Sequence, residues 1–208
     1  MANLLRKTNF DTALTEEVAD LGGSGFGVMM KFDANTSKYS IIGGGDVEIG
    51  RRYIAHVDQY ARGHVKFVDK RPVDWDIKRL VEGEPKKRED LDEPELADKV
   101  DDPWVYQRYL PLEDIETSEI VVFVSKSVGA KIAFSNLLQT YKIGSHRGKP
   151  IVKLAIGSFN TRDYGRRARP DFAIVGWTGG NVMPAMNEEG PPPTESGDPG
   201  YDLSALDR

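Results

Sequence analysis

The sequence predicts a mainly β domain with one principal α-helix. Short segments of alternating apolar and polar residues recur from Phe26 to Trp177, and turn-forming residues separate them. One amphipathic stretch, residues 127–141, is long enough for a stable helix and interrupts this series. A chain of 208 residues suits one well-buried domain with appendages better than two full domains.

Composition divides the chain into three parts. Residues 1–23 are expected to form an N-terminal arm with a short helix around residues 11–21. Residues 24–177 carry the strands, the helix and an acidic insertion at 82–102. Residues 178–208 are acidic and rich in Gly and Pro. This composition predicts a disordered tail, because it buries too little apolar surface to offset its ordering entropy.

The first half of the domain predicts a hairpin and three further strands. Residues 26–42 alternate in polarity around the turn sequence at 33–36. The further strands are expected at residues 52–57, 64–68 and 73–80, with turns at 61–63 and 69–72. The insertion has only a few apolar residues among many charges, which predicts a long excursion and leaves open whether it is ordered.

The second half predicts strands around the principal helix. Alternation from residue 104 to residue 110 indicates a strand, and residues 119–124 are apolar enough for a strand covered on both faces. Ser127 is the expected helix cap and Gly144 the expected stop. Two strands, residues 150–159 and 170–177, are expected to flank a basic loop at 160–169.

The formal net charge of −5 hides a segregation of charge. Residues 82–102 carry −6 and residues 187–208 carry −5, so the rest of the chain carries +6. The absence of cysteine excludes a disulfide framework, a thiol nucleophile and Cys-ligated zinc. No apolar run approaches the ~18 residues of a membrane span, and the N-terminus is polar. The expectation is a soluble protein in the cytoplasm, with no membrane partner.

Basic residues and rings gather in the second half. Residues 141–170 contain eight Lys and Arg residues against one acid, with aromatic residues among them. Cations interleaved with flat rings suit a single-stranded nucleic acid, DNA or RNA, because phosphates pair with cations and bases stack on rings. The residues predicted to bind it are Arg52, Lys66, Trp75, Trp104, Tyr106, Tyr109, Lys149, Lys153, Phe159, Arg162, Tyr164, Arg166, Arg167 and Arg169.

Catalytic patterns are weak by comparison. The three histidines show no metal-ligand spacing, and no serine occupies a nucleophile elbow. Asp76 and Lys78 resemble the second half of the PD-(D/E)xK nuclease motif, in which Asp76 would bind Mg²⁺ with an upstream acid such as Asp58. An amphipathic strand explains these residues more simply. We therefore predict no enzyme activity, no metal and no cofactor.

Several short motifs resemble phage and prophage proteins of similar size. They are Lys31-Phe32-Asp33, Asp102-Pro103-Trp104, Leu110-Pro111-Leu112 and the terminal Val175-Gly176-Trp177, and the resemblance covers residues 25–177. The order of strands, one helix and a final hairpin is also similar to phage single-stranded-DNA-binding proteins of the OB fold. This resemblance implies a partly open OB-like barrel with extra N-terminal strands.

The resemblance also implies a function and partners. It implies sequence-tolerant binding of single-stranded DNA in phage replication or recombination, within the bacterial host cell. In that class an acidic tail recruits replication or recombination proteins, which here would use Glu188, Glu189, Asp198, Asp202 and Asp207. The end of the chain, Ala205-Leu206-Asp207-Arg208, lacks the acidic-aromatic terminus of bacterial relatives. A protein-interaction module that binds a host factor is the alternative, a nuclease is third, and a homo-oligomer is left open.

Overall fold

A long central strand organises the sheet. The computed structural model describes residues 27–97, 99–144, 147–161 and 165–179. One edge of β7 (Trp104–Asp114) pairs with β5 (Ala61–Val68) along its first half and with β4 (Arg52–Ala55) near its end. The other edge pairs with β8 (Ile120–Ser125). The remaining strands are β1 (Val28–Asp33), β2 (Lys38–Ile41), β3 (Asp46–Val47), β6 (Arg71–Arg79), β9 (Pro150–Thr161) and β10 (Gly165–Trp177).

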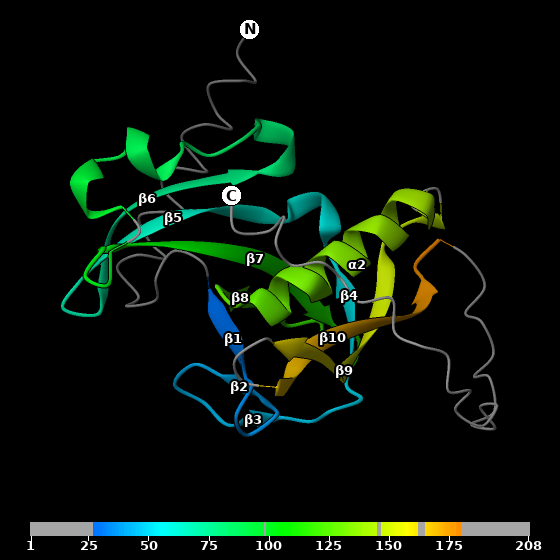
Figure 1. Ribbon diagram of the computed structural model, residues 1–208. Helices are drawn as coiled ribbons and strands as arrows, with labels where there is room; N and C mark the ends of the chain where they lie inside the picture. The colour runs from blue at the N-terminus through cyan, green and yellow to red at the C-terminus, as the bar shows by residue number, and fades with distance from the viewer. Residues whose placement is uncertain (1–26, 98, 145–146, 162–164, 180–208) are drawn as a thin grey trace, which may run out of the picture.

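The sheet has the topology of an OB-like, partly open barrel. Strand order is β10-β9-β4-β7-β8-β1-β2-β3, with β5 and β6 attached through β7, and the sheet curls around α2 (Val128–Gly144), the one α-helix of the described ranges (Figure 1). This helix lies between β8 and β9, the position of the helix between the third and fourth strands of an OB barrel. The predicted fold class is confirmed.

The N-terminal hairpin extends the barrel. Strand β1 pairs in parallel with β8, and β2 follows it in the sheet. The Tyr39 side chain on β2 is fully buried and joins the hairpin to β9 and β10. Its hydroxyl donates to the Ala155 carbonyl (2.8 Å) and accepts the Asp171 backbone N–H (2.9 Å). Burial raises the pKa of Tyr39, so the hydroxyl stays protonated as a donor.

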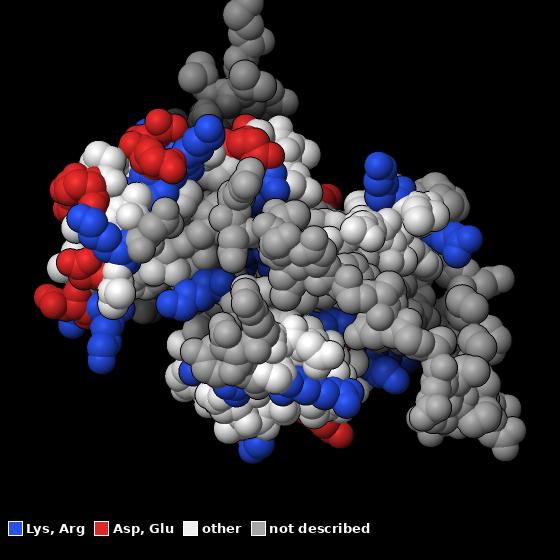
Figure 2. Space-filling model, in the orientation of Figure 1, with Lys and Arg blue, Asp and Glu red and all other residues white. Residues whose placement is uncertain are grey.

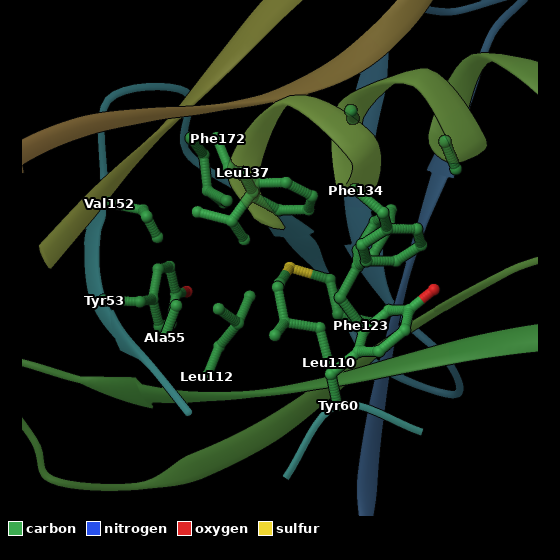
Figure 3. Close-up of a cluster of buried hydrophobic side chains, with 14 of the residues drawn as sticks. Tyr53, Ala55, Tyr60, Leu110, Leu112, Phe123, Phe134, Leu137, Val152 and Phe172 are labelled. Carbon is green, nitrogen blue, oxygen red and sulfur yellow. The ribbon is translucent and has the colours of Figure 1, made fainter. Parts of the chain in front are cut away.

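The main core lies between the curled sheet and α2 (Figure 3). The buried helix residues Ala130, Ala133, Phe134 and Leu137 recur at three- and four-residue spacing, as expected for one helix face. The Phe134 ring contacts Phe123 and Phe172 of the sheet and Tyr60 just before β5, with ring centroids 5.3–5.8 Å apart. Ser127 caps the helix by accepting the Ala130 N–H, as the sequence predicts.

A second, smaller core lies on the opposite face of β5, β7 and β8. Val65, Tyr109 and Val124 are its buried members. Strand β8 therefore has apolar cover on both faces, because Phe123 belongs to the main core and Val124 to the second. This confirms the prediction made from its continuous apolar run.

Two predicted boundaries are wrong. Residues 61–63 were expected to form a turn but lie inside β5, where a Cβ on Gly63 would come 2.0 Å from the Asp76 carbonyl oxygen. The glycine serves close strand approach instead of a turn. The basic loop is also shorter than expected, because β10 begins at Gly165 and Arg166 pairs with Asn160 of β9.

The acidic insertion is ordered where it is described. The 3-10 helix η2 (Leu80–Glu82) leads into it, and it contains the short 3-10 helices η3 (Arg88–Asp90) and η4 (Pro94–Leu96). Arg88 braces the segment by a bidentate contact with Asp102 at 2.8 Å, and both side chains are nearly buried. Ion pairs such as Arg88–Asp102 hold the insertion in place, and the amino-acid composition of the segment does not predict these pairs. The predicted arm (1–23) and the acidic-tail residues Glu188, Glu189, Asp198, Asp202 and Asp207 lie outside the described residues.

Candidate nucleic-acid interface

The basic hairpin β9–β10 carries a shallow groove. The groove has a volume of about 420 Å³. Gly157 lies within β9 at this point, and the strand partner of Ser158 is Ala168. The Arg169 guanidinium lies against Gly157, whereas the small side chains of Ser158 and Ala168 leave their face of the strands open. The lining residues are Ile156, Gly157, Ser158, Arg166, Arg167 and Ala168.

Two of the predicted arginines line this groove. The Arg166 Nε–H donates to the Ser158 hydroxyl at 2.9 Å, which orients its exposed guanidinium. Arg167 lies opposite Phe159 in the strand register. Arg169 is not available in the same way, because it pairs with Asp171 at 2.7 Å and its guanidinium lies against Gly157. The tip residues Arg162 and Tyr164 lie outside the described residues.

A second pair of predicted cations lies across neighbouring strands. Arg52 on β4 and Lys153 on β9 are direct register partners, and both side chains are exposed. Like charges directly opposite one another in a sheet destabilise it. Alternation along β9 places Lys153 on the other face from Ser158, so this pair borders the hairpin without lining its groove.

Lys149 belongs to a polar network. Its ammonium donates to Nδ1 of His56 at 2.9 Å, and Nε2 of His56 contacts Glu113 at 2.9 Å. The lysine donor requires an unprotonated Nδ1, so the proton of the neutral ring sits on Nε2 and points to Glu113. The network joins the residue after β4, β7 and the residue before β9. Lys149 as a direct phosphate contact stays a prediction.

Lys66 is also occupied. Its ammonium contacts the carboxylates of Asp92 and Glu93 from the acidic insertion, and these contacts raise its pKa. The acids lie 26 and 27 residues away in the sequence, so the strand pattern gave no sign of them. In this arrangement Lys66 does not face solvent as a free cation.

Two predicted stacking rings are buried. Trp104 is 6% exposed and Tyr109 is 4% exposed, and Tyr109 belongs to the second core. Alternation places a ring on one face of a strand, but it does not say which face another segment covers. Their assignment as an open stacking platform is corrected.

The other rings differ in exposure. Tyr106 is half-buried under Arg108, whose guanidinium carbon lies 4.9 Å from the ring centroid. Phe159 is half-buried, and its edge lies near Gly129 at the start of α2. Trp75 is 58% exposed, but it lines a separate, largely apolar groove of about 360 Å³ beside the second core. No predicted ring is therefore both exposed and part of the hairpin groove within the described residues.

The nuclease-like residues lie on β6. Asp76 accepts the backbone N–H of Lys86, which ties the insertion to this strand. No group of three or more His, Cys, Asp or Glu side chains is placed to hold a metal ion in the ranges that the structure describes. Asp76 thus has a structural contact with the insertion.

Sequence reasoning missed four residues that line the groove and one at its border. Ile156, Gly157, Ser158 and Ala168 line the groove, and His56 holds Lys149. A Gly-Ser pair inside an otherwise apolar strand was the available signal, because glycine in a strand often marks a close approach. His56 gave no such signal, since its partners lie 57 and 93 residues away.

Comparison with protein-family models, curated proteins and solved structures found no match for this chain. Among the described residues, no helix has both the length and the apolar character needed to cross a membrane.

Proposed function

We propose that this protein binds single-stranded nucleic acid without sequence preference, through the groove of the β9–β10 hairpin. The observation that carries the proposal is the oriented Arg166 guanidinium at the edge of a groove whose floor is small or apolar. Figure 2 supports it, because Lys and Arg side chains predominate over the lower part of the molecule while acids gather over the insertion.

The groove suits a phosphodiester chain. Ser158 uses one of the five N–H donors of Arg166, and the remaining fork matches two oxygens of one phosphate. Ile156 is 41% exposed and offers an apolar surface to a base or sugar. The small side chains of Ser158 and Ala168, which are register partners, leave room for the ligand backbone to approach this part of the hairpin. None of these contacts reads a base edge, so we expect little sequence preference.

Arg52 and Lys153, the two cations beside the groove, add positive charge to the same binding surface. Arg52 and Lys153 repel one another across β4 and β9, and an anion between them would remove that repulsion. Replication or recombination of a phage genome is the setting that the sequence resemblance implies for such binding. We propose it as the biological role together with the binding itself.

A charge-removing variant tests the proposal. Arg166→Ala combined with Arg167→Ala should weaken binding of fluorescein-labelled oligo-dT, measured by fluorescence anisotropy at two salt concentrations. Losing two phosphate contacts should flatten the slope of log K against log salt by about 1.4. The matched control is Lys70→Ala with Arg71→Ala, which removes the same charge from exposed positions at the β5–β6 turn.

Equal losses of affinity in the two variants would show a general effect of charge and would contradict the hairpin as the binding site. No binding by the wild-type protein at physiological salt would favour the protein-interaction alternative.

A further inference from the structure

The acidic insertion covers one face of the strands β5 and β7. Register pairs join Arg62 to Arg108, His64 to Tyr106 and Lys66 to Trp104. Paired residues of antiparallel strands project from the same face, so these six side chains share one surface. We call it the covered face, and its residues are Arg62, His64, Lys66, Trp104, Tyr106 and Arg108.

The covered face contains a row of cations. Arg62 on β5 is the register partner of Lys78 on β6 as well as of Arg108 on β7. Three positive side chains therefore follow one another across three neighbouring strands, ~5 Å apart at their Cα atoms. Such a row is unfavourable unless anions lie over it.

Carboxylates of the insertion supply part of this negative charge. Glu84 contacts Arg62, while Asp92 and Glu93 contact Lys66. The three carboxylates are 76%, 54% and 42% exposed, and exposed ion pairs contribute only ~0–1 kcal/mol each. None of the short helices η2, η3 and η4 contains a buried residue. The carboxylates over Arg62 and Lys66 are thus held by partly exposed charge pairs, while the Arg88–Asp102 pair and the Lys86 N–H bond to Asp76 fix the rest of the insertion.

The cover also leaves polar atoms of the covered face without partners. Arg62 Nε, His64 Nδ1 and Trp104 Nε1 are the buried side-chain atoms of the described residues that lack a hydrogen bond of good geometry, although the Trp104 N–H lies close enough to the Asp92 carboxylate to help lower the pKa of Asp92. All three belong to the covered face. A buried polar group without a partner costs ~1–3 kcal/mol. His64 and Trp104 are more than nine-tenths buried, so water does not readily replace a missing partner.

The rings of the covered face add surface for a nucleic acid. Arg108 stacks on Tyr106, and the Lys66 ammonium lies 5.9 Å from the centroid of Trp104. The His64 ring contacts Tyr106 edge-on, with centroids 4.9 Å apart. Cations layered on rings are typical of surfaces that track a phosphate backbone and stack bases.

We propose that the covered face is a second binding surface for the phosphodiester backbone, and that Glu84, Asp92 and Glu93 occupy it as intramolecular phosphate substitutes. Single-stranded nucleic acid displaces these carboxylates and binds Arg62, Lys66 and Arg108. This deepens the proposed function and rests on it for the identity of the ligand. The insertion then lowers the affinity of the protein for single-stranded nucleic acid. Neutralising Glu84, Asp92 and Glu93 raises that affinity.

The test removes the three carboxylates that contact the covered face. The variant Glu84→Gln, Asp92→Asn, Glu93→Gln is compared with Glu89→Gln, Asp90→Asn, Glu95→Gln, which changes the charge of the same segment equally. Glu89, Asp90 and Glu95 are exposed and make no ion pair within the described residues. Anisotropy with labelled oligo-dT should give ~10-fold tighter binding for the first variant. Two added phosphate contacts should also steepen its salt slope by about 1.4.

Further substitutions in the first triple variant show which cations are responsible for its gain in affinity. In the first variant, Arg62→Ala with Lys66→Ala should abolish the gain, whereas Arg166→Ala with Arg167→Ala should preserve its fold-change. The single change Glu84→Gln, at the most exposed of the three positions, guards against loss of folding and should give a smaller gain of the same sign. Circular dichroism and thermal unfolding confirm that each variant is folded.

The outcomes separate this inference from the proposed function. Equal affinities of the two triple variants, or a gain that survives removal of Arg62 and Lys66, would overturn the inference. If wild-type protein binds through Arg166 and Arg167 while the first triple variant binds no better, only the inference fails. If wild-type protein does not bind and the first triple variant does, the hairpin proposal fails and the covered face remains.

Discussion

Asp114 carries a buried carboxylate that accepts three hydrogen bonds. It ends β7, is 3% exposed, and accepts hydrogen bonds from the Arg51 Nε–H and from the backbone N–H groups of Glu116 and Thr117. Burial raises the pKa of Asp114, but these bonds outweigh burial and leave its pKa below the ordinary value. The carboxylate therefore stabilises the fold above its ordinary pKa of 3.8, and this contribution is lost as pH falls through the lower folded pKa.

We predict that Asp114→Asn lowers the free energy of unfolding by ~1–3 kcal/mol at pH 7, because a buried charged acceptor is replaced by a neutral one. Urea unfolding at pH 7 and below pH 4 measures the effect, and the difference from wild type should shrink in acid. Glu116→Gln, at an exposed position in the same turn, is the control and should change stability little. A loss of unfolding free energy in Asp114→Asn that is independent of pH would argue against a role of the Asp114 charge.

At the scale of elements, Tyr39 closes the barrel by joining β2 to the β9–β10 hairpin. Tyr39→Phe keeps the buried ring but leaves the Asp171 N–H and the Ala155 carbonyl without this partner. We expect a loss of ~1–3 kcal/mol in the free energy of unfolding by urea. Tyr141→Phe is the control, because its half-buried hydroxyl makes no hydrogen bond within the described residues. Equal stabilities of the two variants would show that the hydroxyl does not hold the hairpin.

The same elements show what the sequence can and cannot predict. The helix α2 was predictable because its buried residues recur on one face and Ser127 caps it. Most strands followed from alternation, since they are buried on at least one face, but β3 and β6 contain no buried residue. The role of Trp104 was not predictable, because alternation looks the same for an exposed ring and for one under a cover. Lys66 shows the same limit, since its partners come from a distant segment.

At the scale of the whole molecule, charge is arranged by segment. The sequence already showed an acidic insertion within a basic remainder. The structure adds that the insertion lies over the molecule's own cations, whereas the cations of the β9–β10 hairpin lie elsewhere (Figure 2). Net charge therefore understates how strongly the β9–β10 hairpin can attract a polyanion, because the acids of the insertion lie over a different surface.

The small second core has a consequence for local unfolding. It contains three buried residues against sixteen in the main core of the described chain, and β6 pairs with β5 alone. The β5–β6 arm is therefore the part of the sheet with the least apolar burial. Cooperative units of this kind open at a lower free energy than the rest of a domain.

We predict that amide hydrogens of Val65 and Ile77 exchange with deuterium faster than those of Val152 and Leu154, as read by NMR. Exchange from both regions at one common free energy would mean that arm and barrel unfold as a single unit. An arm that opens alone would carry Arg62 and Lys66 away from β7, so the covered face exists only while β5 stays paired with β7.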